Sequence, residues 1–104
     1  MTPNEPPGFT CISASQAHTL LRADPQPRLF DVRDISHYQR SHLPGAAHLS
    51  EDRLMAWMRK LAKDEPIIIY CYHGNASKVY AQMFIDFRFS CVYSVDGGYE
   101  ALCG

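Results

Sequence analysis

The sequence predicts a single α/β domain built on an open, mainly parallel five-stranded sheet with helices on both faces. Short apolar runs rich in β-branched residues alternate along the chain with segments of helical period. The run at 67–70, Ile-Ile-Ile-Tyr, shows no polar alternation, which is typical of a parallel strand covered on both faces. The length of 104 residues suits one domain with a sizeable core.

The five strands are expected where apolar runs stand between turn signals, and parallel neighbours should be joined by right-handed connections. The segment 28–33 reads Arg-Leu-Phe-Asp-Val-Arg, and 91–95 reads Cys-Val-Tyr-Ser-Val. The expected strands are residues 9–12, 28–33, 47–49, 67–70 and 91–95.

The intervening helices are indicated by apolar residues spaced three and four apart. Ser13 or Ser15 is expected to cap the first helix, which the sequence DPQP ends, and Ser50 is expected to cap the clearest one. A short helix is expected at 35–41 and a last helical turn after 96–98. The apolar stripes of the three longer helices are Ala17, Leu20 and Leu21; Leu54, Trp57, Met58 and Leu61; and Tyr80, Met83, Phe84 and Phe87.

Composition excludes several classes of function. Ten Lys and Arg against eleven Asp and Glu give a formal net charge of −1, and no stretch concentrates basic residues, so nucleic acid is not an expected partner. Residues 1–8 carry three prolines and read as a flexible leader to a domain at 9–104. The start lacks the pattern of a secretory signal and no apolar run could span a bilayer, so we expect no membrane partner and a cytoplasmic location.

The four cysteines lie in different contexts. Cys11 and Cys91 fall in apolar, strand-like runs and are expected to be buried as small hydrophobes, while Cys103 is expected to be inert near the C-terminus. A disulfide framework is not expected without a secretory signal. No CxxC pair is present and the histidines lack ligand spacing, so no metal site is expected.

Cys71 lies between the expected strand at 67–70 and the next expected helix, in the stretch PIIIYCYHGNASK at 66–78. Ligands of parallel α/β folds collect at the carboxyl ends of the strands, where this thiol is expected. The small residues after it would let successive N–H groups curl inward, with the N-terminus of the next helix behind them. Such a cradle, with Lys78 nearby and no acidic residue from 66 to 85, would favour a thiolate.

A plainer interpretation is that Cys71 ends a core strand and an ordinary loop follows. Gly74 and Asn75 just before a helix reduce helix propensity without gaining packing, however. That choice of residues is better explained by a loop shaped around a bound group.

Three ordered motifs resemble those of the rhodaneses, the thiosulfate sulfurtransferases, particularly their small single-domain GlpE type. The stretch CYHGNASK is similar to the active-site loop of that family. LFDVRDISHYQRSHLPGAAHL resembles the family's Asp-Val-Arg and Pro-Gly-Ala signature, and VYSVDGGYEAL its C-terminal Asp-Gly-Gly signature. The resemblance spans about residues 9–102. Ser41 and Leu102 depart from the family pattern, where Gly and Trp are usual.

The resemblance implies a rhodanese fold in which Cys71 is the nucleophile of a ping-pong sulfur transfer. The thiolate would take the outer sulfur of thiosulfate, release sulfite, and pass the sulfur from a persulfide to cyanide or a small thiol. No metal or organic cofactor is implied. Backbone N–H groups of the loop would hold the charged sulfur, and the substrate-binding residues would be Tyr72, His73, Gly74, Asn75, Ala76, Ser77 and Lys78.

Other functions remain open at this point. The domain could instead carry persulfide sulfur to a protein partner, such as a thioredoxin-like acceptor. A cysteine-dependent phosphatase would need one more loop residue and an arginine six positions after the cysteine, where Ser77 stands. A catalytically inactive regulatory domain of this family normally lacks the cysteine. Asp31 and Arg33 are expected to form structural polar contacts at a strand end, with Arg33 as a further source of positive potential.

Overall fold

Five parallel strands form one sheet in a computed structural model of the chain, which describes residues 8–104. The strand order is β1-β5-β4-β2-β3, and every pair of neighbours is parallel. β4 therefore lies at the centre of the sheet, as its unbroken apolar sequence predicts. The strands are β1 (Thr10–Ile12), β2 (Arg28–Asp31), β3 (Ala47–His48), β4 (Ile67–Tyr70) and β5 (Val92–Val95).

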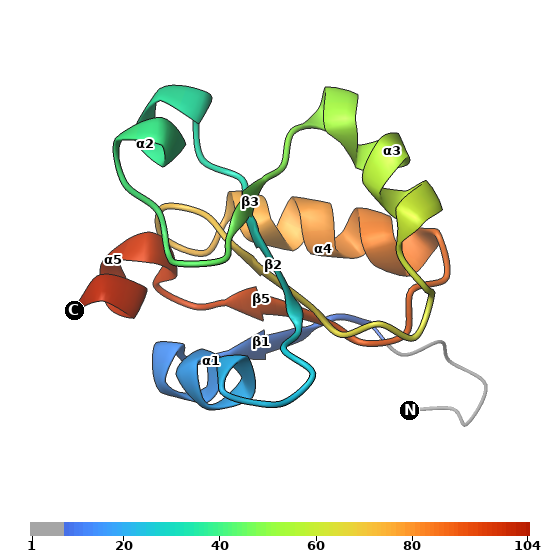
Figure 1. Cartoon of the computed structure of the whole chain (residues 1–104), viewed down its shortest axis with the longest axis horizontal. Helices are drawn as coiled ribbons and strands as arrows, with labels where there is room; N and C mark the ends of the chain where they lie inside the picture. The colour runs from blue at the N-terminus through green and yellow to red at the C-terminus, as the bar shows by residue number, and fades with distance from the viewer. Residues whose placement is uncertain (1–7) are drawn as a thin grey trace.

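The helices cover both faces of this sheet. In Figure 1, α3 and α4 lie on one side of the strands and α1 and α5 on the other, while α2 stands at the end of β2. The predicted fold class is confirmed. The helices are α1 (Ala14–Leu21), α2 (Ile35–Arg40), α3 (Glu51–Lys60), α4 (Ala76–Asp86) and α5 (Gly98–Cys103).

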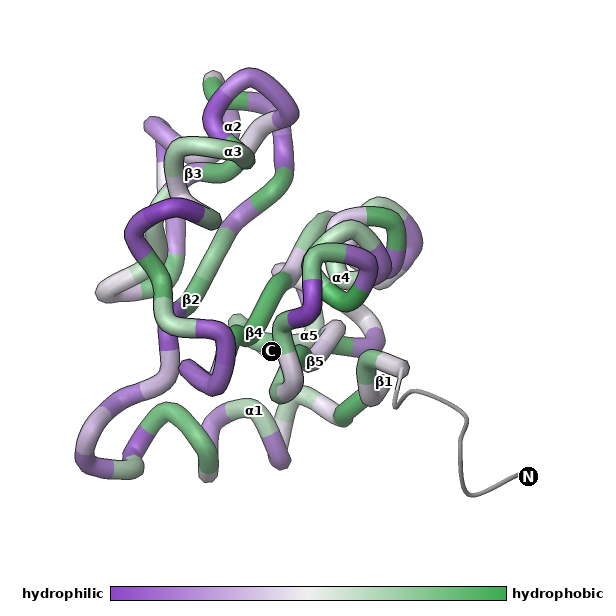
Figure 2. The backbone as a smooth tube through the Cα atoms, turned by 90° about the vertical axis from the view of Figure 1, so that its right-hand side faces the viewer, coloured by the Kyte–Doolittle hydropathy of each residue, from purple (hydrophilic) through white to green (hydrophobic). Residues whose placement is uncertain are grey.

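Alternate residues of β4 pack into two separate hydrophobic cores. Ile67 and Ile69 pack with the apolar side chains of α3 and α4, and Ile68 and Tyr70 pack with those of α1 and α5. All four are completely buried, because successive strand residues point to opposite faces and both faces are covered. Figure 2 shows the hydrophobic colouring along β4 between α1 and α4.

The structure shows which serines cap the starts of α1 and α3. Ser13, not Ser15, caps α1: its Oγ accepts the Gln16 N–H at 3.1 Å, and Gln16 Oε1 accepts the Ser13 N–H at 2.9 Å. Ser50 occupies the N-cap position of α3 but makes no side-chain bond to the helix backbone. Its hydroxyl donates to Asp52 instead.

Two expectations of burial are wrong. Cys11 is exposed, because it lies on an edge strand paired only with β5 and points away from the face where Ile12 is buried. Phe87 is 44 % exposed. The chain leaves α4 at this point through Arg88, whose φ is 75°, so Phe89 rather than Phe87 enters the core, with its ring 5.0 Å from that of Phe84. Cys91 is partly buried, just before β5.

The expected leader, residues 1–8, falls almost wholly outside the described residues, of which only Gly8 belongs to it. Among residues 8–104, no helix combines the length and the apolar character needed to cross a membrane.

Replacing Phe30 by Ala should lower the free energy of unfolding by about 3–5 kcal/mol. The ring is completely buried, 5.0 Å from the ring of Trp57 and 5.9 Å from that of Phe84, so its loss leaves a cavity between β2, α3 and α4. Urea unfolding followed by circular dichroism measures the change. The exposed Phe87→Ala is the matched control and should change it by about 0.5 kcal/mol or less. Equal losses in both variants would contradict this packing.

Candidate active site

The candidate site forms where the carboxyl ends of the parallel strands meet. Cys71 directly follows β4, and Val32 and Arg33 follow β2 on one side of it. Asp96 and Gly97 follow β5 on the other side. The parallel arrangement therefore brings all three sequence motifs to one edge of the sheet, the usual ligand-binding edge of such folds.

The Cys71 sulfur is enclosed by hydrogen-bonding groups of its own loop. The Gly74 N–H donates to Sγ at 3.1 Å, and the thiol contacts Ser77 Oγ at 3.4 Å. Gly74 has a φ of 107°, which turns the loop back over the sulfur in a conformation that side-chain-bearing residues rarely adopt. Ser77 is completely buried, and its hydroxyl is 2.7 Å from that of Ser94 on β5.

These contacts favour the ionised sulfur. Burial raises the pKa of the Cys71 thiol, but hydrogen bonds from the Ser77 hydroxyl and from the amides of Ser77, Gly74 and His73 lower it by more. The net direction is downward. The side chain is only 2 % exposed, so a thiolate here is held by protein donors rather than by bulk water. A lowered thiol pKa favours nucleophilic attack, because the thiolate is the attacking species.

The turn after β5 holds this loop in place through two backbone hydrogen bonds. The Tyr99 N–H donates to the Cys71 carbonyl at 2.7 Å, and the Gly97 N–H donates to that of His73 at 3.2 Å. Gly98, whose φ is 58°, lies so close that a Cβ there would overlap the carbonyl oxygens of Cys71 and Tyr72. The Gly-Gly pair of the third motif therefore allows the close approach of two backbone segments.

Tyr72 connects the loop to α2. Its hydroxyl accepts the Asp34 N–H at 3.2 Å and contacts Nδ1 of His37. The His37 and Tyr72 rings meet edge to face with their centroids 5.3 Å apart. The residue after the candidate nucleophile thus fixes the distance between the loop and the end of β2.

Asp31 and Arg33 form the structural contact that their position suggests. Arg33 Nη2 lies 2.9 Å from Asp31 Oδ2, and its Nε lies 3.1 Å from the same oxygen. The same Nη2 donates to the Ser41 carbonyl at 2.6 Å, and the guanidinium lies 3.7 Å from the centroid of the Tyr99 ring. Arg33 therefore braces α2 and α5 against the sheet edge beside the loop.

The structure separates the predicted binding residues into two groups. Gly74 and Ser77 contact the sulfur directly. The remaining side chains, those of Tyr72, His73, Asn75, Ala76 and Lys78, are exposed. Of these five residues, His73 also contributes an amide that lowers the pKa of Cys71.

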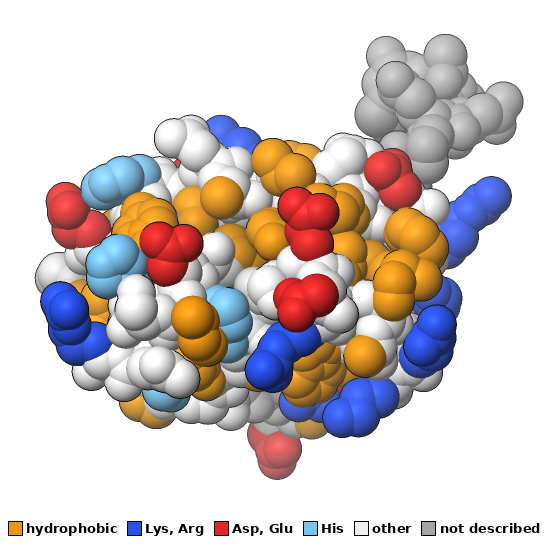
Figure 3. All heavy atoms as spheres, turned by 90° about the horizontal axis from the view of Figure 1, so that it is seen from above, with side chains coloured by type: hydrophobic (Ala, Val, Ile, Leu, Met, Phe, Trp, Pro, Cys, Tyr) orange, Lys and Arg blue, Asp and Glu red, His pale blue; other side chains and the backbone are white. Residues whose placement is uncertain are grey.

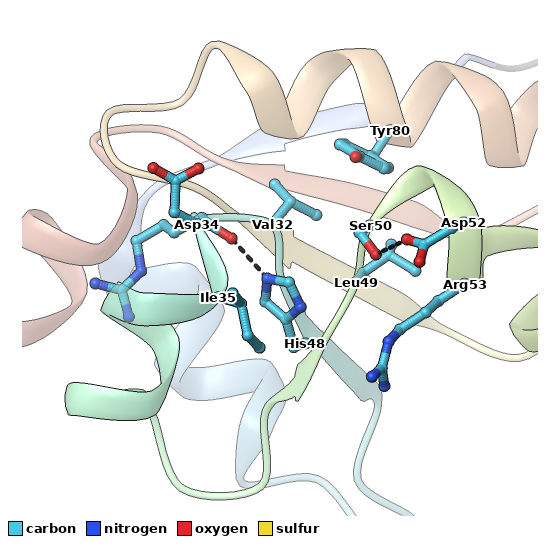
Figure 4. Close-up of a pocket in the computed structure, with 10 residues that line it drawn as sticks. Val32, Asp34, Ile35, His48, Leu49, Ser50, Asp52, Arg53 and Tyr80 are labelled. Carbon is cyan, nitrogen blue, oxygen red and sulfur yellow. Dashed lines mark hydrogen bonds between the residues drawn. The ribbon is translucent and has the colours of Figure 1, made fainter.

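A pocket of about 440 Å³ lies next to the loop, at the ends of β2 and β3. It is lined by Val32, Asp34, His48 and Arg53, among others, and Tyr80 of α4 closes one side (Figure 4). His48 is fixed by its Nε2, which is 2.6 Å from the Arg33 carbonyl. Cys71 does not line this pocket. The pocket is therefore a neighbour of the sulfur site and not the sulfur site itself.

Two residues of the site were not identified from the sequence. Ser94 supports Ser77 from β5, and Gly98 allows the loop to approach. The signal for Ser94 was a hydroxyl in the middle of an otherwise apolar strand, VYSV, which predicts a buried polar group in need of a partner. The partner is 17 residues away in the sequence and becomes visible only in the fold.

A family comparison agrees with this geometry. A model of the rhodanese-like domain matches residues 13–104, and the chain belongs to this family. The family match supports sulfurtransferase chemistry with a cysteine nucleophile in general terms.

Solved structures show the same fold. A rhodanese-like domain protein from Staphylococcus aureus is 19 % identical with a TM-score of 0.75, over 90 % of this chain and 91 % of that one. A protein from Staphylococcus saprophyticus is 18 % identical with a TM-score of 0.77, over 90 % and 93 %. A protein of unknown function from Rhodopseudomonas palustris, described as a possible tyrosine phosphatase, is 20 % identical with a TM-score of 0.78, over 91 % and 80 %. At sequence identities this low, the comparisons establish that the fold is shared and nothing more.

Replacing Ser77 by Ala should slow alkylation of Cys71 by iodoacetamide by about tenfold at pH values well below the midpoint of the thiol titration, the effect of losing one charge-assisted hydrogen bond. The Ser77 hydroxyl lowers the pKa of the thiol, so its removal raises that pKa, and the rate profile moves to higher pH. The exposed Ser15→Ala on α1 is the control and should leave the profile in place. An unchanged profile in the Ser77 variant would contradict the proposed stabilisation.

Replacing Gly98 by Ala should displace the loop and lower Cys71 reactivity, because the new Cβ overlaps two loop carbonyls. Amide chemical shifts of residues 71–77 should change along with the alkylation rate. Gly8→Ala is the control, since a Cβ there meets nothing within 4 Å. Wild-type reactivity and loop shifts in the Gly98 variant would show that the two segments are not in contact.

Proposed function

We propose that the protein is a thiosulfate sulfurtransferase that works through a persulfide on Cys71. The observation that carries this proposal is the set of hydrogen-bonding groups around the sulfur: the Gly74 amide donates to it at 3.1 Å, and the Ser77 hydroxyl lies 3.4 Å from it. These groups lower the pKa of the thiol. Membership of the rhodanese-like family supports the class of chemistry.

In the first half-reaction the Cys71 thiolate attacks the outer sulfur of thiosulfate. A new S–S bond forms, the bond between the two sulfurs of thiosulfate breaks, and its electron pair leaves with sulfite. The enzyme then holds a persulfide anion with the same charge as the original thiolate. The amides that hold the thiolate can also hold this anion, because the loop is built from backbone donors that need no rearrangement.

In the second half-reaction an acceptor takes the terminal sulfur. Cyanide attacks it, thiocyanate leaves, and the Cys71 thiolate is restored; a thiol acceptor would give its own persulfide instead. No proton needs to be moved by the protein when all reacting sulfurs are ionised. Exposed Lys78 at the start of α4 would attract the anionic donor, and exposed His73 would shape the opening.

A relay role uses the same intermediate with a protein as acceptor. The exposed loop side chains, Tyr72 among them at 37 %, would be available to such a partner. Transfer rates to cyanide, a small dithiol and a thioredoxin-like protein compare the two roles. A preference of several orders of magnitude for the protein thiol would favour the relay.

Phosphatase chemistry is less well supported. The Rhodopseudomonas palustris protein carries that description as a possibility, but here the sixth residue after the cysteine is Ser77, whose hydroxyl points to the sulfur and to Ser94. The guanidinium of Arg33 lies beside the loop, but it already pairs with Asp31 and donates to the Ser41 carbonyl, so it is not free to bind phosphate. A bidentate arginine contact to phosphate is therefore missing from the described loop.

Incubation with thiosulfate should add one sulfur atom to the protein by intact mass, and cyanide should remove it with formation of thiocyanate. Cys71→Ser should abolish both, because a hydroxyl of nearly the same size is far less acidic. A variant with Cys11, Cys91 and Cys103 all replaced by Ala should retain both. Sulfur loading by Cys71→Ser, or none by the triple variant, would contradict the assignment of the nucleophile. Hydrolysis of an aryl phosphate that requires Cys71, without any sulfur loading, would favour the phosphatase.

A further inference from the structure

The outer face of α3 carries a cationic groove. Its walls are formed by Arg53, Ala56, Trp57, Arg59 and Lys60, and its volume is about 390 Å³. Figure 3 shows Lys and Arg side chains gathered at one edge of the molecule, beside hydrophobic atoms. The chain as a whole has a formal net charge of −1, so this concentration of positive charge is local.

The cations of the groove form no ion pair within residues 8–104. Among residues 8–104 the ion pairs are Arg28 with Glu65 and Arg33 with Asp31. Within that part of the chain, Arg53, Arg59 and Lys60 therefore have no carboxylate at ion-pair distance. Each is exposed, so it can meet an incoming anion without first breaking an ion pair.

Trp57 gives the groove a fixed aromatic wall. Its ring packs against the buried ring of Phe30, with centroids 5.0 Å apart and the ring planes 74° apart. Lys60 Nζ lies 4.9 Å from the centroid of the indole, and the Arg28 guanidinium lies 5.3 Å from it. Tryptophan and arginine are among the residues most enriched in binding hot spots.

The groove shares one lining residue, Arg53, with the 440 Å³ pocket beside the active-site loop, at the ends of β2 and β3. The other end of that pocket reaches Arg33 and Asp34, next to the anchor of Tyr72 (Figure 4). A molecule that extends from α3 past Arg53 would therefore reach the pocket beside the candidate active site.

We propose that the outer face of α3 binds an acidic segment of a partner protein. Carboxylates of the segment pair with Arg53, Arg59 and Lys60, and an apolar side chain of it covers Trp57. That the bound partner exchanges sulfur with Cys71 rests on the proposed function, whereas the binding itself does not.

Carboxylates at both ends of the groove favour a short acidic segment over a nucleic acid. Glu51 and Asp52 open α3, and Asp64 and Glu65 follow its end. A continuous phosphate backbone would meet these acidic residues on either side of the cations. A peptide whose acidic residues are limited to the span from Arg53 to Lys60 avoids them.

Trp57 is the single tryptophan of the chain, so its emission reports occupation of the groove. The probes are a short synthetic peptide with several glutamates and one phenylalanine, and the same peptide with each Glu replaced by Gln. The Glu peptide should change the Trp57 emission in a saturable way that added salt weakens. The Gln peptide should cause no such change.

Charge reversal identifies the surface. Arg59→Glu with Lys60→Glu should weaken binding of a fluorescently labelled Glu peptide at least about tenfold by anisotropy. Arg22→Glu with Arg88→Glu changes the net charge equally on exposed sites outside α3 and should leave affinity within about twofold. Both double variants should load sulfur from thiosulfate like the wild-type protein.

Three results would overturn the proposal: equal affinity for the Gln peptide, equal loss of affinity in both double variants, or tighter binding of a labelled single-stranded RNA to the same groove. Peptide binding without any sulfur loading on Cys71 would preserve this proposal and contradict the proposed function. Sulfur loading on Cys71 without peptide binding would support the proposed function and contradict the proposal that α3 binds an acidic segment.

Discussion

The hydrogen bonds that converge on the Cys71 sulfur are the constraint on which the site depends. Burial alone would make this thiol harder to ionise, because a charge loses its water when it enters the protein. The amides of His73, Gly74 and Ser77 and the hydroxyl of Ser77 reverse that effect and lower its pKa. The amides are positioned by backbone geometry, so their share of the stabilisation survives most changes of side chain in the loop, whereas the share of the Ser77 hydroxyl does not.

The fold explains why such a loop can be held in place. β4 is the central strand, and its end is fixed laterally by β2 and β5. The turn after β5 supports the loop through the Tyr99 and Gly97 amides. Tyr72, which follows the cysteine, accepts a hydrogen bond from the Asp34 amide at the start of α2. The buried Asp31–Arg33 pair braces the side of the site next to β2. The three motifs are far apart in the sequence and act as one unit because parallel strands end at the same edge.

Much of this arrangement was predictable from the sequence. The unbroken apolar run of β4 indicated a central parallel strand, and the small residues after Cys71 indicated a loop curled around an anion. Local patterns could not reveal contacts between distant segments: the Ser77–Ser94 hydrogen bond and the approach of Gly98 to the loop are set by the register of β4 against β5. Burial of Cys11 and Phe87 was wrongly expected, because apolar composition does not show whether a strand is at an edge or where a helix ends.

The central claim is that the donors of the loop lower the pKa of the Cys71 thiol in spite of its burial, and the titration of this thiol tests the claim most directly. Labelling cysteine with ¹³C at Cβ in a variant that lacks Cys11, Cys91 and Cys103 leaves one signal to follow with pH. The account predicts a midpoint below the value of about 8.5 for a free cysteine. A midpoint at or above that value would show that burial outweighs the loop donors, and would contradict the account.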